Sequence, residues 1–323
     1  MLAYVLRRFA YGGLVVLGVL GVLFVLFFTI ATPDDIARRA LGEKARQEAI
    51  EQWKSNHGYD RPMWPIHAGE FRSDNLLFHH YATMLRFDFG SSDYDGVPIV
   101  ERMQKGAVPS LTLTLPLFLF EITIAILVAL FVAVFRGTYI DRAGLVLSVL
   151  VMSVPVVMVI IGAQYMIAKT LAWFPLSGYD RSLELIARFL ALPVLVGVIS
   201  GIGGEVRFLR TVFVEETSRD YVRTARAKGA SEMRVMLHHV LRNSLIPVLT
   251  RVVLQIPFLF TGALLLESFF GIPGLGSLTV DSINNNDFAT LRVIVFIGAI
   301  LFVVAQIITD LSYALVDPRV RLE

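Results

Sequence analysis

The chain has 323 residues, of which 55% are hydrophobic and only 17% are charged, and its mean hydropathy is +0.66. A soluble domain of this length would carry about a quarter charged residues, and the apolar residues here cluster in long runs, which predicts a polytopic membrane protein. The net charge of +2 says little about partners, whereas the absence of cysteine excludes disulfides, thiol catalysis and Cys-ligated metal sites.

The first apolar run covers 9–33, contains no charged residue and follows the pair Arg7-Arg8. A cleaved signal peptide would have a shorter apolar core and a small-residue cleavage site. The run is long enough to span a bilayer, so we expect an uncleaved first transmembrane helix here.

The next segment, 34–105, is expected to form one large extracytoplasmic loop. Residues 37–53, ARRALGEKARQEAIEQW, are rich in good helix formers and predict a helix, whereas two prolines in HGYDRPMWP stop any helix there. RFDFGSSDYDG at 86–96 is typical of a turn. A short amphipathic helix over 99–105 is expected to lead the chain into the membrane.

Five more apolar runs follow this loop, and they cover 106–135, 143–168, 189–204, 252–266 and 293–309. The last three are shorter than the roughly 20 residues that a spanning helix needs. Flanking Arg188, Arg251 and Arg292 can extend their side chains to the interface and so lengthen them. The predicted fold class is therefore all-α, a polytopic membrane protein with six transmembrane helices.

The orientation follows from Lys and Arg in the short loops. With the N-terminus inside, 15 of these residues lie inside, and four lie in short outside segments: Lys169, Arg181, Arg188 and Arg292. The 34–105 loop holds ten basic and twelve acidic residues, but long loops are translocated almost regardless of charge. We therefore expect both termini in the cytoplasm, with a cytoplasmic tail over 317–323.

The inside loop between the fourth and fifth helices, 205–245, leads into a basic passage at 223–247, RTARAKGASEMRVMLHHVLRNSLIP. A helix over 215–228 is expected to end at Gly229, which suits a left-handed cap. Ser231 is expected to cap a second helix, with Glu232 in its first turn. The passage therefore predicts two helices joined by a turn.

Helical spacing divides the second of these helices into two stripes. The apolar stripe comprises Met233, Met236, Leu237, Val240 and Leu241. The polar stripe comprises Arg234, His238 and Arg242. Such a helix can lie on the anionic inner leaflet, or it can dock its apolar stripe into a groove on a soluble partner. The pattern by itself favours neither.

Motifs for catalysis are missing from the sequence, because it contains neither HExxH nor GxSxG. The neighbouring histidines at 79–80 and 238–239 would point about 100° apart on a helix and do not form a metal site. GIPGLGS at 271–277 lacks the GK[ST] ending of a phosphate-binding loop, so a constrained turn or re-entrant hairpin is expected there. The chain is therefore not expected to be an enzyme, and any ATP must be bound by a partner.

Glu121 is the one acid near the middle of an apolar run. Carboxylates inside a membrane are costly and usually face a bundle interior or an aqueous path, so Glu121 either lines a pathway or serves as a structural hydrogen-bonding group. Gln164, Gln255 and Gln306 are weaker signals of the same kind. A proton- or ion-coupled secondary transporter centred on Glu121 is the main alternative function, although no internal repeat supports it.

The passage at 223–247 resembles the cytoplasmic coupling loop of binding-protein-dependent ABC importer permeases. The pattern of that loop is EAA, three residues and Gly, followed by nine residues and I-x-L-P. Ala225 and Gly229 match, whereas Arg223 and Thr224 replace the Glu and the first Ala. HVLR at 239–242 stands at I-x-L-P, and this divergence is typical of the oligopeptide/dipeptide/nickel branch.

Other segments that resemble this branch extend the similarity over nearly the whole chain. They are YVLRRF (4–9), YDRP (59–62), FDFGSS (87–92), ESFFGIPGLGSL (267–278) and DLSYALVDPRVR (310–321). The sequence departs from the branch at ATPDD (31–35), at Gln306 and at NNNDFA (284–289). These departures leave the finer subfamily and the substrate open.

The resemblance implies one transmembrane permease domain over 1–323 in the bacterial cytoplasmic (inner) membrane, with a five-helix core over 106–316. It implies a substrate of di- or oligopeptides and no cofactor bound by this chain. The implied partners are a homologous second permease subunit, two cytosolic ABC ATPase subunits that bind ATP and Mg, and an extracytoplasmic solute-binding protein. Membrane lipid surrounds such a protein, and no nucleic acid is expected.

The resemblance also assigns roles to residues. The expected ATPase-coupling residues are Arg223, Ala225, Lys228, Gly229, Met233, Arg234, Met236, Leu237, Val240, Leu241 and Arg242. Of these, the apolar side chains would contact the ATPase, Arg234 and Arg242 would pair with its carboxylates, Gly229 would permit the turn and Ala225 close packing. Glu121, Gln164 and Gln255 are the candidate pathway-lining residues.

Overall fold

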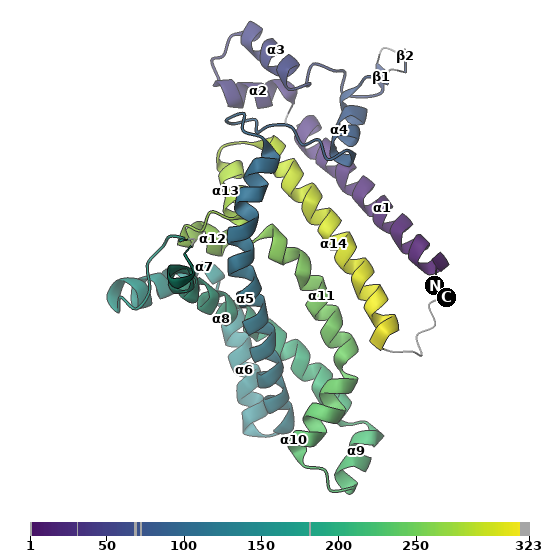
Figure 1. The fold of residues 1–323 in the computed structure, drawn as a ribbon, viewed down its shortest axis with the longest axis vertical. Coiled ribbons are helices and arrows are strands. Elements are labelled where there is room, and N and C mark those ends of the chain that lie inside the picture. Colours follow the sequence, from purple (N-terminus) through teal and green to yellow (C-terminus); the bar gives the residue numbers. More distant parts are fainter. Residues whose placement is uncertain (1, 31, 68–69, 72, 181, 317–323) are drawn as a thin grey trace.

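A computed structural model describes residues 2–30, 32–67, 70–71, 73–180 and 182–316. Figure 1 shows an elongated, almost wholly helical molecule. Three short helices gather at one of its ends: α2 (Pro33–Leu41), α3 (Gln47–Asn56) and α4 (Leu76–Leu85). The predicted tail over 317–323 and Arg181 lie outside the described residues.

The first helix, α1 (Leu2–Phe24), continues as the π-helical segment η1 (Val25–Ile30). It lies beside α14 (Phe288–Val316), and the two helices approach closely at Gly12, where an added Cβ would overlap the Val303 side chain. Residues 6–28 form a helix long and apolar enough to cross a membrane, which confirms the predicted first span.

The segment 34–105 contains more helices than its sequence predicts. The single helix expected over 37–53 is divided into α2 and α3, because Gly42 adopts φ 101° and ends α2. Two-residue strands, β1 (Ile66–His67) and β2 (Glu70–Phe71), pair antiparallel. The short helix expected over 99–105 is the beginning of the 36-residue helix α5 (Ile99–Val134).

The remaining helices form the core. The long ones are α5, α6 (Tyr139–Ser153), α8 (Leu183–Thr217), α11 (Leu245–Thr261) and α14. The shorter ones are α7 (Val156–Ala163), which continues as η2 (Gln164–Thr170), α12 (Leu264–Phe270) and α13 (Leu275–Asn284). The two helices of the basic passage, α9 (Asp220–Ala227) and α10 (Glu232–Arg234) with η3 (Val235–Leu241), lie at the opposite end from α2 and α3.

Among the described residues, five helices are long and apolar enough to cross a membrane, and the number rises to six if the pair 139–153 and 156–170 is one span. This agrees with the six helices predicted. The third span is not straight, because its two halves meet at 86°. Pro155 causes the break: it forces Val154 into extended backbone at ψ 120° and cannot continue the helical hydrogen bonds.

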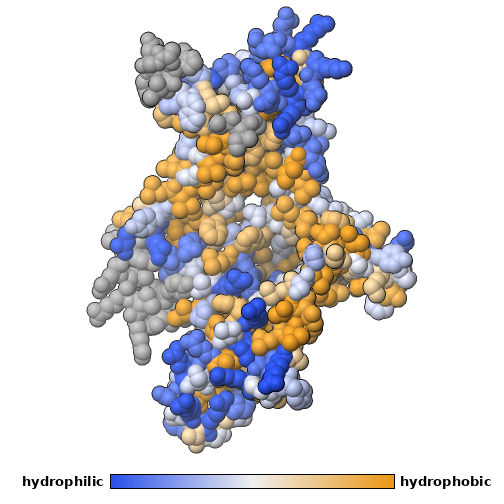
Figure 2. Space-filling view, turned by 180° about the vertical axis from the view of Figure 1, so that it is seen from behind, coloured by the Kyte–Doolittle hydropathy of each residue, from blue (hydrophilic) through white to orange (hydrophobic). Residues whose placement is uncertain are grey.

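Apolar clusters hold the core helices together. One cluster joins α5, α8, α9, η3 and α11, and its central members include Ala129, Leu209, Phe213, Val222 and Val240. A second joins α5, α7, α8 and α12. Figure 2 shows hydrophilic residues at both ends of the molecule and a hydrophobic band between them. In the lower half of the face shown there, hydrophilic patches interrupt this band.

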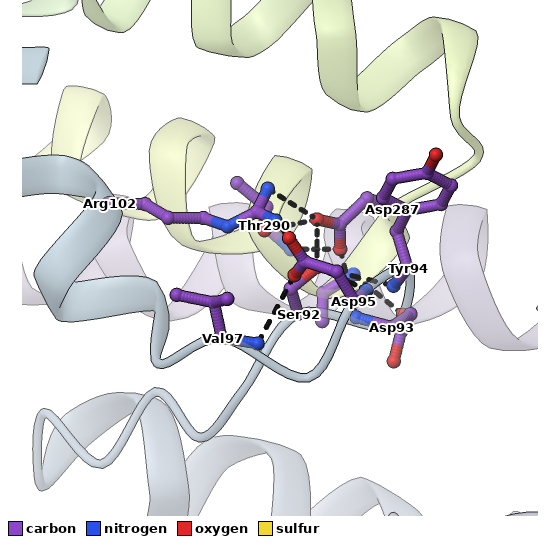
Figure 3. A network of polar contacts seen from close by, with 9 residues as sticks. Ser92, Asp93, Tyr94, Asp95, Val97, Arg102, Asp287 and Thr290 are labelled. Carbon is purple, nitrogen blue, oxygen red and sulfur yellow. Dashed lines mark hydrogen bonds and ion pairs between the residues drawn. The ribbon is translucent and has the colours of Figure 1, made fainter.

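Asp287 joins the loop that precedes α5 to the start of α14 (Figure 3). Its carboxylate accepts hydrogen bonds from Ser92 Oγ at 2.6 Å, from the Asp93 amide at 3.1 Å and from Thr290 Oγ1 at 2.6 Å. Arg102 Nη1 lies 3.6 Å from the same carboxylate. Asp287 belongs to NNNDFA, one of the segments where the sequence departs from the family pattern.

Arg292 does not reach an interface as expected, because its side chain is buried, with only 6% of the residue exposed. The guanidinium lies 4.5 Å from the centre of the Phe28 ring and donates a hydrogen bond to the Tyr59 hydroxyl. Asp93 lies on the other side of Tyr59 and accepts from that hydroxyl at 3.4 Å. A cation packed against two aromatic rings therefore joins α14 to η1 and to the segment that follows α3.

Candidate coupling surface and transmembrane cleft

The turn of the basic passage has the geometry that its sequence predicts at Gly229. This residue adopts φ 80°, in the left-handed region, and its amide donates to the Arg226 carbonyl at 2.9 Å. The preceding helix differs from the prediction, because the chain breaks at Ser218 and the helix expected over 215–228 is the end of α8 followed by α9.

An ion pair that the sequence did not suggest closes this turn. Arg226 donates through Nε and Nη2 to the two carboxylate oxygens of Glu232, at 2.9 and 3.1 Å. Ser231 takes the N-cap position of α10 but makes no side-chain cap hydrogen bond. Glu232 was expected only as a first-turn acid. Its bidentate pairing with Arg226, six residues earlier, links α9 to α10 and restrains their relative orientation.

The apolar stripe of the second helix is divided between the interior and the surface. Met236 is only 2% exposed, and Val240 and the unpredicted Val235 are fully buried in the cluster with Val222 and Ala225. Met233 is 69% exposed. The π-helical backbone of η3 explains the division, because a five-residue repeat places Val235 and Val240 on one face.

Four of the other predicted coupling residues, Ala225, Lys228, Gly229 and Arg234, line one groove of about 470 Å³ between α9 and α10. Its lining residues are Tyr221, Thr224, Ala225, Lys228, Gly229, Ala230, Arg234 and His239. Arg223, Leu237 and Arg242 are exposed outside it, and Leu241 is partly buried against the core. The geometry therefore gives a basic, open groove with exposed apolar side chains beside it.

Two of the three candidate pathway residues lie in one cleft of about 310 Å³ between α5 and α11. Glu121 and Gln255 are its charged and amide groups, and its other lining residues are Thr114, Leu117, Phe118, Phe258, Leu259, Gly262 and Ala263. Gln164 is placed elsewhere: its side chain donates to the Phe269 and Leu176 carbonyls at 2.9 and 3.1 Å. Gln306 of α14 lines a pocket between α14 and α1, together with Arg8.

An ion pair beside this cleft was missed by the sequence reasoning. Glu205 of α8 is only 4% exposed and accepts from Arg251 Nη2 at 2.8 Å and from Gln255 Nε2 at 2.9 Å. Arg251 was expected to reach an interface, yet it is directed to this carboxylate. The sequence did contain a signal for this pair. Glu205 directly follows the apolar run 189–204, and Arg251 directly precedes the run 252–266.

Glu267 is a second buried carboxylate, and it organises the glycine-rich turn. The residue is fully buried, and it accepts hydrogen bonds from Ser110 Oγ at 2.8 Å and from the Ala263 and Ser277 amides at 3.0 Å. Gly271 adopts φ 65° between α12 and α13, so the first four residues of GIPGLGS form the constrained turn expected, and the last three begin α13. Among the described residues, no group of three or more His, Asp or Glu could hold a metal ion.

Long apolar helices, a largely apolar cleft that contains Glu121 and Gln255, and an exposed basic groove at one end define the class of multi-pass membrane proteins. The family described as "Binding-protein-dependent transport system inner membrane component" matches residues 122–322, and the family described as "Binding-prot-dependent transport system membrane comp, N-term" matches residues 1–76. The chain belongs to this family of inner-membrane transport components, so the predicted ABC importer permease is confirmed.

Curated relatives resemble the chain from end to end. The "Glutathione transport system permease protein GsiC" of Salmonella choleraesuis (strain SC-B67) is 32% identical over 322 residues, 99% of each chain. The "Probable peptide ABC transporter permease protein y4tP" of Sinorhizobium fredii (strain NBRC 101917 / NGR234) is 29% identical over 321 residues, 98% of this chain and 99% of the relative. Neither the family nor these relatives favour the secondary transporter considered as an alternative.

Proposed function

We propose that this chain forms one half of the membrane pathway of an ATP-driven importer of peptides. Its proposed partners are a homologous second permease, two cytosolic ATPases that bind ATP and Mg, and an extracytoplasmic solute-binding protein. The names of the relatives, which specify glutathione and peptide transport, support a peptide substrate. A peptide needs a wide hydrated path, which is easier to build between two subunits than inside one six-helix bundle.

The observation that carries the proposal is the groove around Gly229 at the end of α8 and α11. Lys228 and Arg234 line it, while exposed Met233 and Leu237 offer apolar contacts beside it. These four side chains suit an ATPase surface that combines an apolar cleft with carboxylates. Arg223 and Arg242, which are also exposed, would extend the charged contact.

The buried residues of the same passage would transmit the movement of the ATPases. Met236 and Val240 pack in one cluster with Leu209 and Phe213 of α8 and with Val248 of α11. A displacement of η3 therefore cannot occur without moving these two membrane helices, since packed interiors shift as units. Met236, Val240 and Leu241 would thus couple from inside the chain, and Ala225 would permit the close approach of α9.

The proposed orientation places the groove in the cytoplasm, with both termini on the same side. The 34–105 segment would then face the binding protein, with the core over 106–316 and the coupling loop over 205–245. In the structure α5 begins at Ile99 and α8 continues to Thr217. The proposed start of the core, at residue 106, and the proposed start of the coupling loop, at residue 205, therefore both lie inside helices.

Purification of a tagged copy of the chain tests the proposal. We expect a second permease and two ATPases to co-purify at physiological salt. Adding the binding protein loaded with peptide should increase ATP hydrolysis by this complex, whereas the empty binding protein should increase it less. A chain that purifies without an ATPase and drives peptide uptake through a proton gradient would contradict the proposal.

A further inference from the structure

The transmembrane cleft contains a carboxylate whose charge no neighbouring cation pairs with. None of the hydrogen bonds or ion pairs among the described residues includes Glu121. Glu205 and Arg251 are near enough to act on it electrostatically. However, Arg251 donates through Nε and Nη2 to Glu205, so the charges of those two groups offset each other. Of the two carboxylates in this cluster, Glu121 is therefore the one that has no cation as its partner.

The Glu121 carboxylate packs closely against α8. Its oxygens lie against Gly201 of α8, where an added Cβ would overlap them. The cleft in front of it is lined by Leu117, Phe118 and Phe258, with Gln255 as a further polar group. At 1.5 Å per residue, Glu121 lies roughly 20 Å from the end of α5, which is well inside a bilayer core about 30 Å thick.

We infer that Glu121 is the site at which this permease receives the ammonium group of its cargo, a conclusion that rests on the proposed peptide import. An ammonium group supplies the missing positive charge and three hydrogen-bond donors, and in an apolar cleft such a charge-assisted contact is strong. The Glu205–Arg251 pair keeps a second carboxylate from competing for the same cation. The cleft walls accommodate the apolar part of a short peptide.

Uptake measured with the whole reconstituted complex tests this inference. Three peptides are compared at concentrations that saturate the binding protein: trialanine, N-acetyl-trialanine and the N-acetyl tripeptide with lysine in the middle. Saturation removes any selection by the binding protein. We expect wild type to import trialanine about tenfold faster than N-acetyl-trialanine, since losing one charge-assisted contact costs about that factor. The lysine peptide shows whether a side-chain ammonium can replace the terminal one.

Glu121→Gln keeps the shape of the side chain and removes its charge. We expect it to lower trialanine uptake to the rate of N-acetyl-trialanine and to leave the latter unchanged. Glu121→Asp should keep part of the preference, and Glu43→Gln, at an exposed position of the extracytoplasmic loop, should keep all of it. Co-purification of the ATPases shows that each variant assembles.

Two results would overturn the inference. One is a Glu121→Gln variant that still imports trialanine faster than N-acetyl-trialanine by the wild-type factor, and the other is a variant in which the uptake of all three peptides falls equally. Either can occur while wild type still imports trialanine with ATP, so the proposed peptide import would stand. If wild type imports no peptide with ATP, the proposed function fails, and the inference fails with it.

Discussion

Arg251 of α11 and Glu205 of α8 form a bidentate ion pair that joins two of the candidate membrane-spanning segments, with nitrogen–oxygen distances between 2.8 and 3.2 Å. Glu205 is buried, so its charge would be costly without the guanidinium. The pair joins the two long helices that carry the basic groove at one end. It therefore contributes to the stability of the core and to the relative position of the groove and the cleft.

Arg251→Leu should destabilise the protein by about 1–3 kcal/mol, because it leaves a buried carboxylate without its cation. The Arg251 side chain is 46% exposed, which keeps the expected loss at the lower end of that range. Thermal unfolding in lipid nanodiscs measures the effect, with Arg207→Leu on an exposed face of α8 as the matched control. Equal melting temperatures for the two variants would mean that the pair contributes nothing to stability.

Gly229→Val should reduce ATP-driven uptake while leaving membrane insertion intact. A β-branched residue is strained at φ 80°, by about 1–2 kcal/mol, and the turn would open to relieve that strain. Gly13→Val is the matched control, because an added side chain there meets nothing within 4 Å. Normal uptake by the Gly229 variant would show that the turn is not needed for coupling.

Arg234→Glu should weaken the association with the ATPases, because it reverses a charge at the rim of the groove. The amount of ATPase that co-purifies at increasing salt measures this effect, and the loss should be greatest at low salt, where charge pairing is strongest. Arg142→Glu, also exposed but on α6, serves as control. Unchanged co-purification at physiological salt would refute the charge-pairing role.

The helices of the 34–105 segment should loosen in acid because of His80. Burial among Phe24 and Phe28, with Arg292 nearby, lowers the pKa of His80 to about 3. An unfolded histidine titrates near 6.5, so stability is complete above about pH 6.5 and falls as the pH decreases from there towards 3. Nε2 has no hydrogen-bond partner in the described part of the chain to stabilise a proton.

His80→Phe should therefore remove part of the acid sensitivity. The melting temperature of wild type should fall between pH 7.5 and pH 5, and that of the variant should fall less. His238→Phe, on the exposed face of η3, should behave as wild type does. An equal fall in all three proteins would mean that other groups cause the acid sensitivity.

The sequence predicts those parts of the structure that depend on local patterns. Apolar runs locate the membrane helices, and the glycine between two helical segments marks the left-handed turn at Gly229. Proline also carries a local signal, but at Pro155 the apolar run continues through the break, so the 86° bend was not anticipated.

The features that were missed depend on how distant side chains meet. Glu205 and Arg251 are 46 residues apart, and only the fold, in which α8 and α11 both pack against α5, brings their charges together. The π-helical backbone of η3 likewise arises in packing, and it moves Val235 into the core in place of Met233 and Leu237. A stripe drawn with α-helical spacing cannot show that change.

The initial rate of peptide uptake into proteoliposomes that contain the whole complex tests the central claim most directly. The account predicts uptake that requires ATP on the groove side and loaded binding protein on the other side, and that stops when the ATPases are omitted. Collapsing the proton gradient should leave this rate unchanged. Uptake that continues without the ATPases and stops when the proton gradient is collapsed would contradict the account.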